Sequence, residues 1–370
     1  MLPPFKLERY FARYEFTVRH LLCASDCESV SVGDLLALEP EAAERLNRLW
    51  LGYTEAPGAP SLRREIAAVY DSIAPEEVLV HSGAQEAIFL LMQALLGEGD
   101  HVIVHWPCYQ SLLEVARSSG HPFSLWRARE ENGWRLDIDE LRALVRPNTR
   151  AIVLNTPHNP TGSHLTAEEL HRVVAIAQDR GASLLVDEVY RGSEYDESQL
   201  LPAACDCGPS TVSIGVMSKT YGLAGLRIGW IATHDEKLLR RVAALKDYTT
   251  ICNSAPSELL AEIALRNREQ LAQRNRAIIL QNLALLDDFF ARHADRFSWQ
   301  RPQAGPIAFP KLLGEAVEPF CEKLARDAGV LLLPGTVYED TGNHLRIGFG
   351  RRSMPAALKA LEDYLEKEYC

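Results

Sequence analysis

The stretch SKTYGLAGLRIGW, residues 218–230, contains the side chains whose chemistry is easiest to interpret. Lys219 follows the apolar run 211–217 and precedes Gly222 and Gly225, which let the backbone pass close to a bulky group. A desolvated lysine loses its proton more readily, and its neutral amine can attack a carbonyl to form a Schiff base. We therefore expect a nucleophilic lysine here, although an isolated lysine is more often a solvated surface residue.

Arg227 lies eight residues after the lysine, in the run LRIGWIAT, which has the pattern of a buried strand. An unpaired guanidinium in such a strand would destabilise the fold, so it needs an anionic partner. A phosphate held through two guanidinium nitrogens would provide that partner, and a structural pair with a carboxylate is the alternative. The combination of Lys219 and Arg227 favours a binding site.

The elements that would position these residues alternate between short apolar runs and helical patterns. Buried strands separated by helices predict an α/β fold with a mostly parallel sheet covered on both faces. A helical stretch from about Pro256 predicts a long helix that links two lobes, and Ser61 is placed to cap an earlier helix. We expect a large domain over 46–250 and a smaller α+β domain over 1–45 and 251–370. The predicted strands of the large domain are 78–81, 101–105, 151–155, 183–190, 211–217 and 226–233.

Polar residues follow several of these strands, and the carboxyl ends of parallel strands form one binding edge. The sequence SGAQ opens a helix whose N-terminus suits a phosphate, although small residues begin many helices without any ligand. Tyr109 could stack on a planar ring or fill the core, and Asn159 could bond a ring oxygen or only make a turn. Asp187 ends an apolar strand, where a protonated pyridine nitrogen would stabilise its charge, or it caps a helix. Tyr190 could reach the same ring oxygen as Asn159.

Residues 1–45 show neither helical nor strand period, and we expect an irregular segment that contains a loop around Asp26 and Glu28. If these two carboxylates line the mouth of the site, they favour a substrate with a cationic side chain. A solvated acidic loop is the alternative interpretation.

The overall composition limits the partners. The chain has 370 residues, 47% of them hydrophobic, and a formal charge of −11, which argues against nucleic acid or an anionic membrane as the main partner. The absence of a long apolar run predicts a cytoplasmic protein. The eight cysteines lack the spacing of a zinc site, so we expect no metal.

The motif SKTYGLAGLRIGW resembles the lysine motif of fold-type I pyridoxal-phosphate (PLP) enzymes, the class I/II aminotransferase family. The resemblance implies a seven-stranded type of sheet and pyridoxal 5'-phosphate as cofactor. It also assigns phosphate-binding roles to Gly83, Ala84, Gln85 and Arg227. The family often has another phosphate ligand, a serine, three residues before the lysine. This chain has Val216 there, and we include Ser218 among the cofactor-binding residues.

The resemblance also implies roles around the ring and the substrate. It implies that Lys219 forms the Schiff base, that Asp187 pairs with the pyridine nitrogen, and that Tyr109 stacks on the ring. Asn159 and Tyr190 match the partners of the phenolic oxygen.

Two further residues match family positions outside the ring. Arg346, in HLRIGFG, matches the arginine that binds the substrate α-carboxylate, and its place in an apolar strand independently suggests a carboxylate partner. Tyr53 matches a tyrosine that reaches the phosphate of a neighbouring subunit, which implies a homodimer with shared active sites.

The implied activity is transfer of an amino group between an amino acid and a 2-oxo acid through Lys219. Elimination, replacement or cyclisation of an amino acid on the same scaffold remains open, because nothing in the lysine motif separates these outcomes. A ligand-sensing regulator is a third reading, but such proteins usually carry a DNA-binding domain, for which this chain leaves no room.

Overall fold

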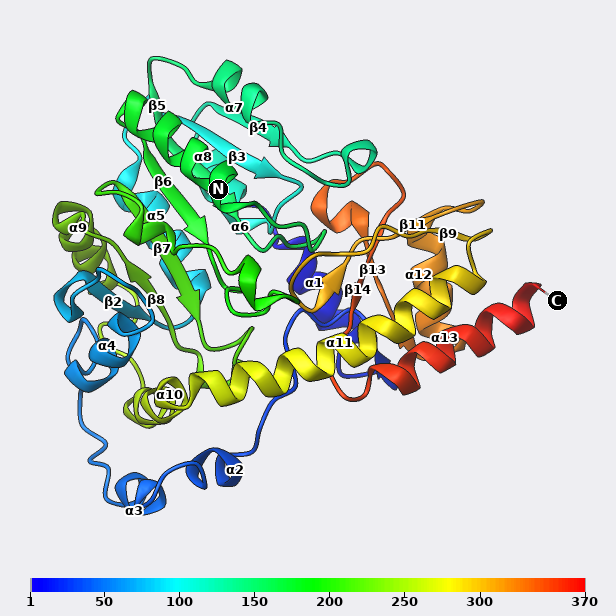
Figure 1. Ribbon diagram of the computed structural model, residues 1–370, viewed down its shortest axis with the longest axis horizontal. Helices are drawn as coiled ribbons and strands as arrows, with labels where there is room; N and C mark the ends of the chain where they lie inside the picture. Colours follow the sequence, from blue (N-terminus) through cyan, green and yellow to red (C-terminus); the bar gives the residue numbers. More distant parts are fainter. Residues whose placement is uncertain (1, 370) are drawn as a thin grey trace.

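A seven-stranded sheet forms the centre of the computed structural model, which describes residues 2–369 (Figure 1). The strand order is β2-β8-β7-β6-β5-β3-β4, and all neighbouring strands are parallel except where β8 pairs with β2 and β7. This sheet confirms the predicted fold class. Its strands are β2 (Val78–His81), β3 (His101–Trp106), β4 (Phe123–Arg127), β5 (Thr149–Asn155), β6 (Ser183–Asp187), β7 (Thr211–Val216) and β8 (Gly229–Ala232).

Helices cover both faces of the sheet, because successive strand residues point to opposite sides. Ile152 of β5 packs in a core with α7 and α8, whereas its neighbour Val153 packs in another core with α5, α6 and α9. The strands therefore read as continuous apolar runs rather than as alternating ones. The helices of this part are α4 (Pro60–Ala67), α5 (Ala84–Leu95), α6 (Ser111–Ser118), α7 (Ile138–Leu144), α8 (Ala167–Arg180) and α9 (Glu236–Lys246).

The helix caps explain where two of these helices begin. Thr166 and Glu169 form a capping box at the start of α8, in which the Thr166 hydroxyl accepts from the backbone N–H of Glu169 at 3.2 Å. The predicted cap at Ser61 is wrong, since α4 begins one residue earlier, at Pro60. The fixed φ of proline suits the first turn of a helix, and it moves the boundary ahead of the serine.

The predicted long helix consists of two helices, α10 (Ala255–Arg266) and α11 (Arg268–Arg292), with Asn267 between them. Figure 1 shows α11 in yellow, running from the side of the sheet to a second group of elements. Apolar side chains of α11, α12 (Val317–Asp327) and α13 (Met354–Tyr369) form a core of their own there. The domain boundaries at residues 45 and 250 stay a prediction. The short strands of this part are β1 (His20–Leu21), β9 (Phe297–Ser298), β10 (Ile307–Ala308), β11 (Lys311–Leu312), β12 (Val330–Leu331), β13 (Leu333–Pro334) and β14 (Leu345–Gly348).

The N-terminal segment is more regular than predicted. It contains α1 (Lys6–Tyr14), α2 (Val32–Leu36) and α3 (Ala42–Asn47), and only the residues around Asp26 lie in a loop. The signal for α1 is the spacing of Leu7, Phe11 and Tyr14, which pack together on the core below the sheet edge. The charged residues between these apolar positions hide the helical period when only the composition of the segment is considered.

Two further observations apply to the described residues. No helix within 2–369 is long and apolar enough to cross a membrane. The same residues contain no group of three or more His, Cys, Asp or Glu side chains that could hold a metal ion, and the seven cysteines among them are free thiols.

Candidate active site

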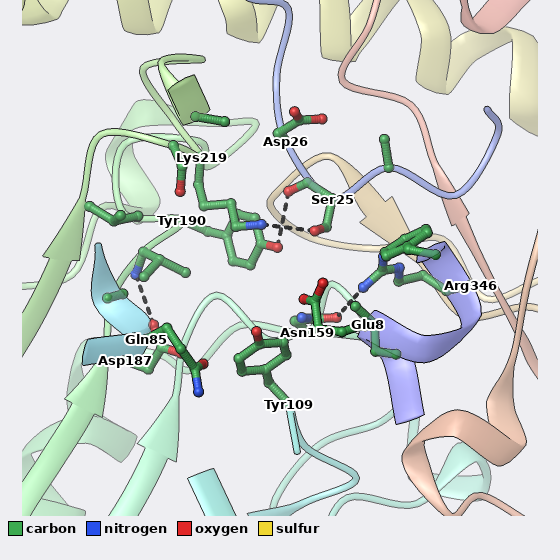
Figure 2. A pocket seen from close by; sticks show the side chains of 18 of the residues that line it. Glu8, Ser25, Asp26, Gln85, Tyr109, Asn159, Asp187, Tyr190, Lys219 and Arg346 are labelled. Carbon is green, nitrogen blue, oxygen red and sulfur yellow. Dashed lines mark hydrogen bonds between the residues drawn. The ribbon is translucent and has the colours of Figure 1, made fainter. Parts of the chain in front are cut away.

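A cavity of about 360 Å³ opens at the carboxyl ends of the parallel strands, between the sheet and the second group of elements (Figure 2). Asp187 is the last residue of β6 and Val216 the last residue of β7, so both strands deliver side chains to this edge. Most of the predicted site residues line the cavity: Ala84, Gln85, Tyr109, Asn159, Asp187, Tyr190, Ser218, Lys219, Arg227 and Arg346.

Lys219 follows β7 and extends into the cavity. Its Nζ donates a hydrogen bond of 2.8 Å to Oγ of Ser25, which lies in the loop after β1. Burial lowers the pKa of the Lys219 amine, while the nearby carboxylate of Asp26 partly opposes that shift. The structure thus provides the desolvated amine that the sequence predicts.

Asp187 lies on the floor of the cavity with an exposed fraction of 5%. Its Oδ1 accepts one hydrogen bond, of 3.2 Å, from the backbone N–H of Val189. Burial raises the pKa of Asp187 to about 7, although the backbone N–H of Val189 and the nearby charge of Lys219 partly oppose that shift. A cation bound in the cavity would therefore be stabilised by this carboxylate.

The turn before α5 and the guanidinium of Arg227 meet at another side of the cavity. Gly83 has a φ of +87°, and a Cβ there would lie 2.5 Å from Nη2 of Arg227, so the turn and the arginine pack closely. The backbone N–H groups that begin α5 and the guanidinium form a donor set that suits an anion.

The predicted strand position of Arg227 is wrong. The strand β8 begins only at Gly229, and Arg227 is exposed, with a φ of +53°, after the short 3₁₀ turn η5 (Ala224–Leu226). Its Nη1 donates to the carbonyl of Ala224 at 3.3 Å. The left-handed backbone at Arg227 stops the strand ladder, and no sequence pattern in LRIGW signals that conformation.

Arg346 of β14 approaches the cavity from the opposite side and is 1% exposed. Its Nη2 donates to the carbonyl of Cys23 at 2.8 Å, and its Nη1 donates to Oδ1 of Asn159 at 3.3 Å. Nη1 also donates to the hydroxyl of Tyr338, which itself donates to Oδ1 of Asn159 at 2.9 Å. The sequence analysis missed Tyr338, because its short 3₁₀ turn, η6 (Gly335–Tyr338), has no apolar period.

The two tyrosines that line the cavity, Tyr109 and Tyr190, each contact a residue of the N-terminal segment. The hydroxyl of Tyr190 donates to the carbonyl of Ser25 at 3.1 Å, and the ring of Tyr109 packs against Phe5 at 5.2 Å between centroids. Figure 2 shows Tyr109, Asn159 and Tyr190 around the same space as Lys219. A flat ring would find aromatic and polar contacts there.

Three predicted residues have other positions. Tyr53 is 86% exposed and lines a separate hollow, so it does not reach the cavity of its own chain. Asp26 lines the cavity but forms a bidentate ion pair with Arg351, with both distances at 2.8 Å. Glu28 is absent from the cavity wall and accepts from the backbone N–H of Arg352 at 2.9 Å. The acidic wall therefore includes Asp26 but not Glu28.

Other carboxylates complete that wall. Glu8 of α1 and Glu15, the residue that follows α1, also line the cavity. Figure 2 shows Glu8 on its helix beside Asn159 and Arg346. The sequence analysis missed Glu8 and Glu15, because it treated this segment as irregular, and the helical stripe that would have revealed them is short.

Known proteins resemble the chain over almost its whole length. The sequence profile described as "Aminotransferase class I and II" matches residues 22–361. The chain belongs to the class I and II aminotransferase family. The enzymes of this family use pyridoxal 5'-phosphate (PLP), and the chain shares their fold type I architecture.

Three relatives illustrate the range of the family. A PLP-dependent aminotransferase from Streptococcus suis superposes with a TM-score of 0.93 and 32% identity, covering 99% of this chain and 98% of that one. The PLP-dependent cyclase OrfR superposes with a TM-score of 0.92 and 31% identity, covering 100% and 98%. Capreomycidine synthase from Streptomyces vinaceus is 29% identical over 369 residues, 98% of this chain and 94% of its own. The family thus includes close relatives with different reactions.

The cavity fits PLP. Burial raises the pKa of the Asp187 carboxyl, and the protonated ring nitrogen of PLP would stabilise its charged form. The donor set of Arg227 and the turn at Gly83 suits the phosphate, and the amine of Lys219 suits the aldehyde.

Proposed function

We propose that the protein is a PLP-dependent aminotransferase that moves an amino group between an amino acid and a 2-oxo acid. The observation that carries this proposal is that Lys219, Asp187 and Arg346 face one cavity from different elements. When bound, PLP supplies an electron sink that stabilises negative charge at the substrate α-carbon. The protein's part is to hold the cofactor and the substrate and to move protons.

Cofactor binding is assigned to two groups of residues. Arg227, Ser218 and the turn formed by Gly83, Ala84 and Gln85 would hold the phosphate, and Val216 offers no hydroxyl to help them. Asp187 would pair with the ring nitrogen, Tyr109 would contact the ring, and Asn159 and Tyr190 would donate hydrogen bonds to it.

Lys219 is assigned the proton transfer. A neutral amine at Nζ can accept a proton from the substrate α-carbon, and burial favours that neutral form by lowering the pKa of Lys219. Ser25 accepts the present hydrogen bond of Nζ and would orient the amine toward the cavity. Arg346 binds the α-carboxylate through its guanidinium and so fixes which bond of the α-carbon faces Lys219.

A second candidate function is cyclisation or elimination of an amino acid with a cationic side chain. Two observations favour it: the full-length similarity to a synthase and to a cyclase, and the acidic wall of the cavity. Arg351 balances Asp26, which leaves the carboxylates of Glu8 and Glu15 in the same wall. Opposite charge at the side-chain end of the cavity would select an ammonium or guanidinium group.

One experiment separates the two functions. The PLP-loaded enzyme is incubated with single amino acids, with or without an added 2-oxo acid, and the products are identified by mass spectrometry. Product beyond one equivalent per enzyme subunit that forms only when the 2-oxo acid is present supports aminotransfer. Sustained turnover without an acceptor contradicts aminotransfer and supports cyclisation or elimination.

The same assay tests the cationic substrate. Glu15→Gln should raise KM for arginine or lysine about fivefold while leaving KM for alanine within twofold, since one carboxylate near a partly exposed cation contributes about 1 kcal/mol. Glu366→Gln, at an exposed position of α13, is the matched control. An equal change for cationic and neutral substrates would exclude this role of the acidic wall.

We further propose a homodimer. The exposed side chains of Trp50, Leu51, Tyr53, Tyr248 and Ile251 are large and hydrophobic, and such exposure is typical of a surface that another chain covers. In a dimer, Tyr53 would reach the cavity of the partner. Sedimentation velocity of the PLP-loaded protein at micromolar concentration should show a dimer, and a monomer would contradict the proposal.

A further inference from the structure

A single carboxylate connects the turn at the start of α5 with the loop 247–253. Glu86 lies in the first turn of α5, and its Oε2 accepts a hydrogen bond of 2.7 Å from the backbone N–H of Ser82. Its Oε1 accepts from the hydroxyls of Thr249 at 2.6 Å and Thr250 at 2.8 Å. Oε2 of Glu86 therefore bonds to the turn and Oε1 bonds to the loop, so one side chain holds both segments.

Glu86 keeps its charge across the physiological range. Burial disfavours that charge, but hydrogen bonds from its neighbours lower the pKa of Glu86 to about 2. His81 lies 3.7 Å from Oε2, measured from Nδ1, and burial lowers the pKa of that histidine, which favours its neutral form. An ionised carboxylate accepts hydrogen bonds on both oxygens, which is what this bridge requires.

The loop 247–253 is held by hydrogen bonds on its buried side and exposes apolar side chains on its other side. Lys246, 1% exposed, donates from Nζ to the carbonyls of Ala56 at 2.6 Å and Ile251 at 3.2 Å. The exposed fraction of Tyr248 is 90%, and that of Ile251 is 52%. The buried side of the loop is thus tied to the segment that carries Tyr53, while its outer side presents apolar groups.

We propose that Glu86 is a positioning residue through which cofactor binding at the turn 83–85 and docking of a second copy of the chain on the loop 247–253 favour each other. This inference rests on the cofactor placement and the homodimer proposed above. A phosphate that orders the turn fixes Ser82 and, through Glu86, the two threonines. By linkage, a partner that packs on the loop strengthens cofactor binding by the same factor.

The test combines hydrogen exchange with sedimentation. In the wild-type chain, saturating PLP should slow amide exchange in peptides that cover 247–253 about tenfold and lower the dimer Kd about tenfold. Glu86→Leu should still bind PLP, as measured by absorbance, but both responses should fall below about twofold. Leucine has no hydrogen-bonding group in its side chain, so it can hold neither the turn nor the loop.

Two further variants separate this role from simple instability. The double variant Thr249→Val with Thr250→Val removes only the loop side of the bridge and should behave like Glu86→Leu. Glu98→Leu, at an exposed position just after α5, is the matched control and should keep both tenfold responses.

The outcomes are distinguishable. Full tenfold responses in Glu86→Leu and in the threonine double variant would overturn the inference, as would a wild-type loop whose amide exchange does not change when PLP binds. A chain that stays monomeric, while its loop responds to PLP through Glu86, would support the link within the chain and overturn the partner's share in it. A wild-type chain that binds no PLP would contradict the proposed function itself.

Discussion

Two aspartates, one partly buried and one buried, show how a structural charge differs from a functional one. Asp340 accepts a hydrogen bond of 2.9 Å from Nδ1 of His344, whose Nε2 lies 3.1 Å from Oε2 of Glu130. Burial disfavours the charge of Asp340, yet the bonds from His344 and nearby backbone hold the pKa of Asp340 below its usual range. Asp187 has one backbone donor, and burial raises its pKa to about 7. A carboxylate that its internal partners hold in the charged form stabilises the fold, whereas one whose burial outweighs its internal partners favours binding of a cation.

The largest expected effect comes from Lys219, which lines the same cavity as Asp187. Lys219→Ala removes the amine that accepts the substrate proton, so turnover should fall by about 10⁴-fold or more. Turnover of the PLP-loaded variant is measured with the best amino donor, and the melting temperature serves as the control for folding. Activity within tenfold of the wild type would assign the chemistry to another group.

Asp187→Asn tests the same site through turnover and through stability. Turnover should fall by about 10²- to 10³-fold, because the neutral amide cannot stabilise a protonated ring nitrogen.

Asp187→Asn is expected to lower turnover but to raise the stability of the cofactor-free protein at high pH. The pKa of Asp187 is about 7 in the folded chain and near 3.8 in the unfolded one, so the folded chain binds more protons between pH 4 and 7. Its free energy of unfolding therefore falls as pH rises through this window. Asp187→Asn lacks this loss and should be more stable than the wild type at pH 8, by on the order of 2 kcal/mol. Chemical denaturation at pH 4.5 and pH 8 measures the difference, and equal stabilities at pH 8 would contradict the assigned pKa.

Arg346→Lys should have a smaller effect that appears mainly in KM. Lysine keeps the charge but cannot bind a carboxylate in bidentate fashion, so KM for the amino donor should rise about 30-fold, equivalent to about 2 kcal/mol. Tyr338→Phe, which loses only the hydroxyl beside Arg346, should raise KM less than fivefold. Steady-state kinetics measure both, and an unchanged KM in Arg346→Lys would remove the arginine from the substrate site.

The smallest effect on catalysis is expected at the cluster formed by Asp340, His344 and Glu130. His344→Gln leaves Asp340 and Glu130 with a weaker partner, so the free energy of unfolding should fall by about 2 kcal/mol. Turnover of the folded variant should stay within twofold of the wild type. A large loss of turnover without loss of stability would mean that this cluster is functional and would end the contrast with Asp187.

Sequence patterns sufficed for six of the seven strands of the sheet, all except β4, and for most of the cavity floor. Asp187 and Lys219 follow strands of continuous apolar residues, and such strands place their carboxyl ends at one edge wherever they occur in the chain. The capping box of α8 also follows from a local pattern, because it depends only on residues close in sequence. These features are local, or they follow from topology.

The features that the sequence concealed depend on tertiary contacts or on single backbone angles. Arg227 leaves its strand because of one left-handed residue. Glu8 and Glu15 reach the cavity only because a short helix packs across the sheet edge, and Tyr338 reaches Arg346 through a 3₁₀ turn. Glu28 seemed equivalent to Asp26 in sequence, but the backbone turns it toward Arg352.

The most direct test of the central claim is chemical labelling of Lys219. The PLP-saturated protein is reduced with borohydride and digested, and its peptides are analysed by mass spectrometry. We expect the pyridoxyl group on the peptide that contains Lys219. The control is Lys219→Ala, treated in the same way after free PLP is removed, and we expect no label on its corresponding peptide. An unmodified Lys219, or a label at another lysine, would contradict the account.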